Sequence, residues 1–465
     1  MDMENSEKMK VKILTMFILF VVTTTSITSV IPISSGNSNE SFTATSDLTE
    51  NHLIEGVPHV GAETWFDCEL ASFAMLYQYL GVNYSYADLF YLSGAGYSLA
   101  SRPWIGSKIW PPIPPFKPYI DPGALVSFWK QDLNFMSKLF GTNSTIIYNN
   151  SKCGINNIDA WREYWGRVKN YLKNDIPVET FIDPIVLPWW REHIPFVKDW
   201  YDKYGVNHTR NRFVGQGHYI VLVGFNESNM SVCYNDMINK SCHYIWMNIS
   251  DLKDGTSYGS LCYWDDVTYI TIVLENTSGS PISKEEAFRL AHERNIMKMQ
   301  GWHINAYDQE YLRLYRKFGI DALKALKNDL KPIKMIPKIQ MWRYISRLIN
   351  LVNPIISADL FHHMNESVWW IIKERELASK SLLEFNYYNE NCSFCLYDGI
   401  LLKKESEKWE EFHLLIQKLT ISFYNNRLLE NILFSVTTLR EMTDIINDII
   451  KLEELILDGV EGINI

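Results

Sequence analysis

The stretches FDCELASFAMLYQYLG, residues 66–81, and GHYIVLVGF, residues 217–225, decide which fold the chain adopts. In the first stretch apolar residues recur at helical spacing, Asp67 is of a type that begins helices, and Gly81 is placed to end one. Cys68 therefore falls in the first turn of a predicted helix. The N–H groups and macrodipole at a helix start favour the thiolate, which is the nucleophilic form of cysteine. A backbone N–H there, that of Cys68 included, can also bind a developing oxyanion.

The second stretch supplies a base for that thiol. His218 opens an apolar strand, and after the turn NESN the stretch MSVCYND, residues 230–236, returns antiparallel and ends at Asp236. Because the end of the second strand lies beside the start of the first, Asp236 can reach the imidazole of His218. The order Cys, His, Asp is that of papain-like thiol enzymes. Taken singly, the cysteine and the histidine each leave a structural role open.

Around these stretches the chain divides into a mixed part and a helical part. Further strands are predicted at HYIWMNI (243–249) and VTYITIVLE (267–275), so we expect an α+β domain with an antiparallel sheet over residues 52–280. After Pro281 long stretches repeat apolar residues at helical spacing, which predicts an all-α domain over residues 281–465. We expect this helical domain to act as a lid or as an oligomer contact.

The N-terminal region predicts export. Three lysines precede the apolar run ILTMFILFVV at residues 13–22, which is typical of a signal peptide. No small-x-small cleavage site stands out, so residues 1–33 are interpreted as a signal peptide or a retained N-terminal anchor. The polar residues 34–51 form a linker. We expect a secreted protein, or one held on the extracellular face of the membrane.

Acceptor triplets for N-linked sugars point in the same direction. The chain has a dozen Asn-x-Ser/Thr triplets without proline, an excess that favours a glycosylated, exported surface. Drift in a chain rich in asparagine and serine is the alternative. The triplets begin at Asn39, Asn83, Asn143, Asn149, Asn207, Asn226, Asn229, Asn239, Asn248, Asn276, Asn365 and Asn391.

Composition excludes some partners. The chain has 465 residues, which predicts two or three domains, and 44 Lys and Arg against 54 Asp and Glu give a net charge of −10. Such a balance provides no basic surface for nucleic acid. We expect a peptide or acyl substrate, for which cell-envelope material is one candidate source. Contact with a membrane is expected only through the N-terminal anchor. Neither a cofactor nor a metal ion is expected, and the oligomeric state stays open.

The cysteine count is odd. If Cys68 stays free among the seven cysteines, the other six are an even set that could form up to three disulfides in an oxidising compartment. A redox-active or zinc-binding role for the pair in NENCSFC is the minor alternative. The six are Cys153, Cys233, Cys242, Cys262, Cys392 and Cys395.

These stretches resemble known families. GVPHVGAETWFDCELASFAMLYQYLG, residues 56–81, resembles the nucleophile region of bacteriocin-processing, papain-like peptidases, and the two strand sequences resemble their His and Asp strands. The N-terminal domain family of butirosin biosynthesis protein H, a papain-like acyltransferase family, is more similar still. That likeness adds LFYLSGAGYSL (89–99) and IPVETFIDPIVLPWW (176–190).

The resemblance implies a role for each triad residue. Cys68 would be the nucleophile, His218 the base and Asp236 the residue that orients it. The implied enzyme cleaves or transfers acyl groups at amide, isopeptide or thioester bonds, as a peptidase, amidase or acyltransferase.

Two positions depart from the peptidase pattern. Those peptidases carry an oxyanion-donating glutamine six residues before the cysteine, where this chain has Ala62, and a glycine after the cysteine, where it has Glu69. Loss of an oxyanion donor costs on the order of 100-fold in rate, and Thr64 and Gln216 are candidate substitutes. Glu69 would oppose thiolate formation. The alternative hypothesis is therefore a catalytically weak or inactive envelope binding protein that retains the papain-like fold.

Four tryptophans are candidates to line an acyl groove, and buried packing explains them equally well. Two of them lie in RPWIGSKIWPPIPPFKP, residues 102–118, which is either a loop over the site or a stiff surface insertion. The four are Trp104, Trp110, Trp189 and Trp190.

Overall fold

The computed structural model describes most of the chain after residue 49. The described residues are 50–62, 67–101, 120–122, 130–149, 158–194, 197–198, 202, 218–257, 268–277, 280–301, 317–337, 362–389, 392–424 and 428–461. Residues 1–48 and 49–465 are separate units. The predicted export segment, nearly all of the linker and the segment 102–118 lie outside the described residues.

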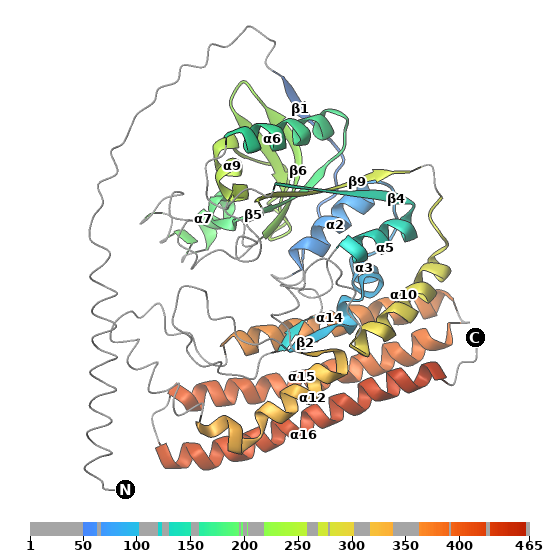
Figure 1. The fold of residues 1–465 in the computed structure, drawn as a ribbon, viewed down its shortest axis with the longest axis vertical. Coiled ribbons are helices and arrows are strands. Elements are labelled where there is room, and N and C mark those ends of the chain that lie inside the picture. Colours follow the sequence, from blue (N-terminus) through green and yellow to red (C-terminus); the bar gives the residue numbers. More distant parts are fainter. Residues whose placement is uncertain are drawn as a thin grey trace. The chain divides into compact units, whose positions relative to one another are not determined.

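A seven-stranded antiparallel sheet carries the mixed half of the fold (Figure 1). Six strands follow the order β4-β9-β5-β6-β7-β8, and β1 pairs with β6. The strands are β1 (Asn51–Leu53), β4 (Thr142–Asn149), β5 (Val178–Ile182), β6 (His218–Asn226), β7 (Ser231–Asn235), β8 (Ile245–Asn248) and β9 (Thr268–Asn276). The four strands predicted from the sequence, β6 to β9, are confirmed within one or two residues at their ends.

Helix α2 (Cys68–Tyr79) begins and ends as its sequence predicts, with one difference. Gly81 adopts a positive φ of 82° just after it, a conformation that suits glycine and ends the helix. Asp67 occupies the N-cap position, as its sequence predicts, but its side chain makes no capping hydrogen bond. The side chain of Asp67 is buried, at 1% exposure.

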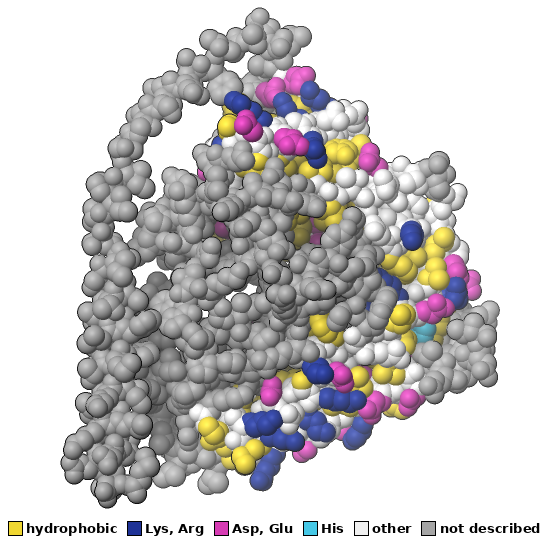
Figure 2. Space-filling view, in the orientation of Figure 1, with side chains coloured by type: hydrophobic (Ala, Val, Ile, Leu, Met, Phe, Trp, Pro, Cys, Tyr) yellow, Lys and Arg dark blue, Asp and Glu magenta, His cyan; other side chains and the backbone are white. Residues whose placement is uncertain are grey.

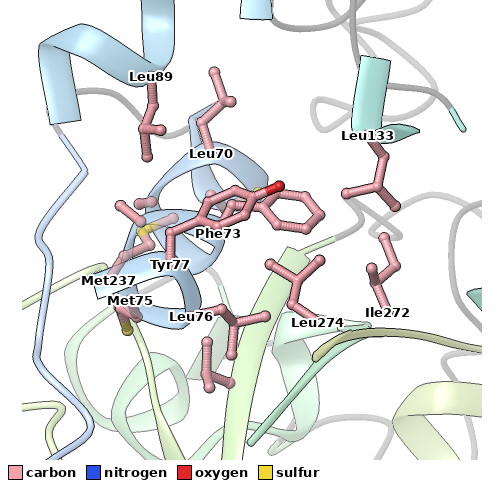
Figure 3. Close-up of a cluster of buried hydrophobic side chains, with 14 of the residues drawn as sticks. Leu70, Phe73, Met75, Leu76, Tyr77, Leu89, Leu133, Met237, Ile272 and Leu274 are labelled. Atoms are coloured by element: carbon pink, nitrogen blue, oxygen red, sulfur yellow. The ribbon is translucent and has the colours of Figure 1, made fainter. Parts of the chain in front are cut away.

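Helix α2 is buried along most of its length because it packs on the sheet. Figure 3 shows Phe73 and Tyr77 of α2 among apolar side chains from the neighbouring elements, including Leu274 and Ile272 of β9 and Leu133. Burial on all sides explains why the helix carries an apolar residue at almost every position rather than along one stripe.

The remaining elements of the first half are mostly short helices around this sheet (Figure 1). They are α3 (Tyr86–Ser93), η2 (Ala95–Tyr97), α5 (Lys130–Phe140), α6 (Ile158–Lys173), η3 (Pro184–Val186), α7 (Pro188–His193) and α9 (Ile249–Ser257). A second, three-stranded sheet consists of β2 (Leu99–Ser101), β3 (Ile120–Pro122) and β10 (Lys317–Phe318).

Long helices dominate the second half. They are α10 (Lys284–Met299), α12 (Gly319–Leu330), α14 (His362–Tyr388), α15 (Ser393–Tyr424) and α16 (Leu428–Glu461). The prediction of an all-α region needs one correction, because β10 lies within it and pairs with β2 of the first half. Among the described helices, none has both the length and the apolar character that a membrane span requires. Figure 2 shows charges of both signs interspersed with hydrophobic side chains on the face drawn.

The two halves share a hydrophobic core across residue 281. The ring of Phe288 in α10 stacks on the ring of Phe385 in α14 with 4.1 Å between centroids. The backbone carbonyl of Phe288 accepts a hydrogen bond from the hydroxyl of Tyr91 in α3. Asp88 of α3 accepts hydrogen bonds from Ser381 of α14 at 2.7 Å and from Lys284 of α10 at 2.8 Å. Helix α3 is therefore packed and hydrogen-bonded to the second half.

The described cysteines include one of the up to three disulfides that the sequence allows, and they leave two of the six candidate cysteines free. Cys392 and Cys395 form a disulfide, whereas Cys68, Cys233 and Cys242 are free and buried. Burial raises the pKa of both Cys233 and Cys242 to about 12, so the thiolate that disulfide formation needs is disfavoured in each. The other two members, Cys153 and Cys262, lie outside the described residues.

A buried ion network ties three long helices to the first half. Arg375 of α14 donates to Glu405 of α15 at 2.7 Å, to Glu453 of α16 at 3.0 Å and to the carbonyl of Gly96 in η2. All three charged side chains are at most 1% exposed. Burial and the charge of Glu405 raise the pKa of Glu453, so one guanidinium holds two buried carboxyl groups of which Glu453 favours the neutral form.

We predict that Arg375→Met lowers the free energy of unfolding by about 3–5 kcal/mol, because it leaves two buried carboxyl groups without their cation. Urea unfolding followed by circular dichroism measures the change. Lys408→Met is the control, since Lys408 makes a partly exposed pair with Glu411 and its loss should cost about 0–1 kcal/mol. Equal losses in the two variants would show that the network contributes no more than a surface pair.

Candidate active site

Three elements bring Cys68, His218 and Asp236 to one place. Cys68 is the first residue of α2, His218 is the first residue of β6, and Asp236 directly follows β7. Because β6 and β7 are antiparallel neighbours, the end of β7 lies beside the start of β6. The three side chains are buried, at 6%, 2% and 0% exposure.

Asp236 is held by donors at both carboxylate oxygens. Its Oδ1 lies 2.8 Å from Nε2 of His218 and accepts a second hydrogen bond from the backbone N–H of Ile238 at 3.0 Å. Its Oδ2 accepts from the indole Nε1 of Trp190 at 3.0 Å. A carboxylate so surrounded is fixed in orientation and remains hydrogen-bonded although it is buried.

This arrangement determines which nitrogen of His218 faces the thiol. A carboxylate accepts hydrogen bonds, so Nε2 of His218 donates to Asp236 and Nδ1 is left for the side-chain hydrogen bond with Cys68. Burial lowers the pKa of His218, but the charge and hydrogen bond of Asp236, together with those of Cys68, raise it to about 10. The raised pKa favours the protonated imidazole, which places a proton donor beside the sulfur.

The segment that precedes α2 is anchored to the turn that carries Asp236. Nε2 of His59 lies 2.8 Å from the carbonyl oxygen of Asp236, and the backbone N–H of Ala62 donates to the carbonyl of Met237 at 3.3 Å. These two contacts tie residues 59–62 to the turn after β7 that carries Asp236.

Glu69, which the sequence predicts to oppose the thiolate, has a partner. The hydroxyl of Tyr219 donates a side-chain hydrogen bond to it. Burial and the neighbouring charges of Glu69 and Glu179 raise the pKa of Tyr219 well above its ordinary value, so the phenol remains a donor. The hydrogen bond disperses part of the negative charge next to Cys68.

A second carboxyl group, that of Glu179, lies near the thiol. Glu179 is on β5 opposite Val221, and its neighbour Phe181 is opposite Tyr219, so Glu179 and Tyr219 share one face of the sheet. Glu179 is 0% exposed, and neither carboxyl oxygen has a hydrogen-bond partner among the described residues. Burial, followed by the charges of Glu69 and Cys68, raises its pKa well above the ordinary value. Burial therefore favours the neutral form of this carboxyl group, which opposes the thiolate less than a carboxylate would.

The other predicted site residues divide into two groups. Trp190 is 4% exposed, and its ring lies edge-on to His218 with 5.0 Å between centroids, so it supports the histidine and the aspartate rather than forming an open wall. Trp189 is half-buried and stacks on His193. A contact of either ring with substrate stays a prediction. The remaining four, Thr64, Gln216, Trp104 and Trp110, lie outside the described residues.

Sequence reasoning missed the roles of Trp190 and Glu179 in this site. A signal existed for Glu179, because an acidic residue inside the apolar strand VETFI must be either exposed or specially placed. No local pattern marks Trp190 as a donor to Asp236, which is 46 residues away in the chain.

The described residues contain no group of three or more His, Cys, Asp or Glu side chains placed to hold a metal ion. The chemistry available at the site is that of a thiol, an imidazole and buried carboxyl groups. Such a set performs nucleophilic attack on a carbonyl carbon, with proton transfer through the imidazole.

Comparison with known proteins agrees with this chemistry. Residues 54–261 match the model of the Peptidase_C39 like family, and this range contains Cys68, His218 and Asp236. The match supports a cysteine peptidase-like assignment for the first half, within the papain-like superfamily. A search of curated proteins gives no match to the chain. The closer likeness to the butirosin biosynthesis protein H family stays a prediction.

We predict that Glu179→Gln has a higher free energy of unfolding than the parent protein, and that this difference grows as the pH rises. The raised pKa of Glu179 means that folding takes up a proton above about pH 4.3, the unfolded value, so the parent protein loses stability from there up to the folded pKa. The variant carries no such group. The difference should be small at pH 4 and grow by up to about 1.4 kcal/mol per pH unit.

Urea unfolding of both proteins at several pH values measures this difference. Glu285→Gln, at an exposed position of α10, is the matched surface control. A difference between Glu179→Gln and its parent that stays constant with pH would contradict a protonated carboxyl at this position.

Proposed function

We propose that this protein is an exported papain-like thiol enzyme that uses Cys68, His218 and Asp236 to cleave amide or isopeptide bonds. The single observation that carries the proposal is the buried hydrogen-bonded series from Cys68 through His218 to Asp236, with Cys68 at the start of α2. A structural histidine would not need a thiol on one ring nitrogen and a fixed carboxylate on the other. The match of residues 54–261 to a cysteine peptidase-like family supports the same chemistry.

The reaction follows from the geometry. The Cys68 sulfur attacks the substrate carbonyl carbon, and the oxygen takes up negative charge near the N–H groups at the start of α2. His218 carries the proton taken from the Cys68 thiol and gives it to the leaving amine. Water then attacks the acyl-enzyme, with His218 accepting its proton, and Cys68 is released. An amine in place of water would make the same intermediate an acyltransferase.

The expected substrate depends on export. The apolar run at residues 13–22 and the dozen acceptor triplets favour a location outside the cytoplasm, where intracellular carrier-protein thioesters do not occur. Peptide or isopeptide bonds in cell-envelope material are therefore the proposed substrates, and hydrolysis is the proposed outcome.

A second candidate is a binding protein with little or no activity. The observation that favours it is Ala62, whose methyl side chain offers no donor and whose backbone N–H already donates to Met237. An oxyanion bound by fewer donors lowers turnover by on the order of 100-fold for each one lost. Thiol reactivity and turnover together separate the two candidates.

We predict that iodoacetamide at about pH 6.5 labels Cys68 at least about 10-fold faster than Cys233 or Cys242, which serve as internal controls because burial raises their pKa to about 12. His218→Ala should slow labelling of Cys68 by about 10- to 100-fold, since the thiolate then loses its imidazolium partner. Peptide mass spectrometry of timed samples measures each rate.

His243→Ala is the matched control, because His243 contacts the backbone of Val57 in the same region without touching the triad. Cys68→Ala should abolish hydrolysis of envelope-derived peptides. Selective labelling without any hydrolysis would favour the binding protein, and absence of selective labelling would contradict the proposed enzyme.

A further inference from the structure

A second sulfur centre lies in the helical half, independent of Cys68. Cys392 directly precedes α15, Cys395 lies in its first turn, and the two form a disulfide. The backbone N–H of Cys395 donates to the carbonyl of Cys392 at 3.1 Å. Both sulfurs are thus at the positive end of a 32-residue helix, where a released thiolate is stabilised.

The position of this disulfide does not suit a purely structural cross-link. Disulfides stabilise a fold chiefly by closing long loops of the unfolded chain. Cys392 and Cys395 are only three residues apart, and the first turn of α15 already holds them together. Reduction of this bond would therefore leave α14 and α15 connected through their packing, which includes Leu382 and Leu402 in the shared core.

The two sulfurs differ in access. Cys395 is completely buried, whereas Cys392 is partly exposed. Large apolar side chains near it in sequence are also exposed, including Tyr388 at 79% and Leu396 at 47%. Cys392, the more exposed residue of the two, is therefore the one to be attacked, and Cys395 is suited to act as the internal leaving group and resolving thiol.

An ionisable pair lies next to the disulfide. Asp398 follows Cys395 by three residues, which places the two on one face of α15 with Cβ atoms about 5–6 Å apart. Its Oδ2 lies 3.2 Å from Nδ1 of His292 and accepts a hydrogen bond from Tyr97 at 3.4 Å. The His292 ring stacks on Phe394, one of the two residues between the cysteines, with 4.1 Å between ring centroids. Burial raises the pKa of Asp398, against the opposing effect of His292 and Tyr97.

We propose that Cys392 and Cys395 form a redox-active disulfide that oxidises peptide thiols by thiol–disulfide exchange. A substrate thiolate attacks Sγ of Cys392, which forms a mixed disulfide and releases Cys395 as a thiolate that takes up a proton. A second thiolate of the substrate then attacks the substrate sulfur that is bonded to Cys392. This forms the substrate disulfide and releases Cys392 as a thiolate, which takes up a proton. Two substrate thiols become one disulfide, and the Cys392–Cys395 disulfide gains two electrons and two protons to become a dithiol.

The first test is equilibration of the full chain in mixtures of reduced and oxidised glutathione, followed by alkylation and peptide mass spectrometry. A redox-active pair changes from oxidised to reduced within the range of these mixtures, whereas a structural disulfide resists reduction throughout. A pair that stays fully oxidised in every mixture, or one that never forms, overturns the proposal. The Cys68→Ala variant should titrate in the same way as the parent.

The second test uses the two single variants with oxidised glutathione as the probe. Cys395→Ser leaves the accessible Cys392 and should form a mixed disulfide at least about 10-fold faster than Cys392→Ser, which leaves only the buried sulfur. Equal rates, or no mixed disulfide in either, would contradict the assigned roles. Circular dichroism confirms folding, and Cys68 labelling should be unchanged in both, because the two sulfur sites are independent.

Discussion

A histidine with 2% of its side chain exposed can hold a proton in this fold because a carboxylate lies 2.8 Å from its ring. Asp236 is itself completely buried, so its carboxylate also needs hydrogen-bond partners to compensate for the loss of water. Trp190 donates from α7, Ile238 donates from the turn after β7, and His59 contacts the carbonyl oxygen. The carboxylate of Asp236 thus links β6, α7 and the turn after β7, and its backbone carbonyl adds a contact with His59.

Two buried acids near the thiol show how the environment sets a role. Asp236 has a donor at each oxygen and an imidazole beside it, whereas Glu179 has no hydrogen-bond partner among the described residues. The first strengthens the basicity of His218, and burial favours the neutral form of the second. Glu69 is a third case, since the hydroxyl of Tyr219 is its donor. Asp236 therefore places its negative charge on the far side of the imidazole from the sulfur, whereas the charge of Glu69 lies next to Cys68.

Local patterns in the sequence predict the parts of the site that depend on neighbouring residues. Helical spacing in residues 66–81 predicts α2 with Cys68 in its first turn, and the hairpin pattern predicts that Asp236 returns to His218. What depends on distant residues could not be predicted. Strand β5 is buried at every position between β9 and β6, so its sequence shows no alternation. The free state of Cys233 and Cys242 follows from where the chain packs them, which their spacing does not encode.

The contacts that cross between the halves have a consequence for the order of folding. Ser381 and Asp88 are 293 residues apart, and Arg375 and Gly96 are 279 residues apart. Because a chain is synthesised from its N-terminus, the carboxylate of Asp88 and the apolar face of α3 are exposed long before their partners are made. Contacts of such sequence separation slow folding and leave apolar surface open to association with other chains. The first half therefore completes its contacts only after α14 has been synthesised, and until then its unpaired surface stays open.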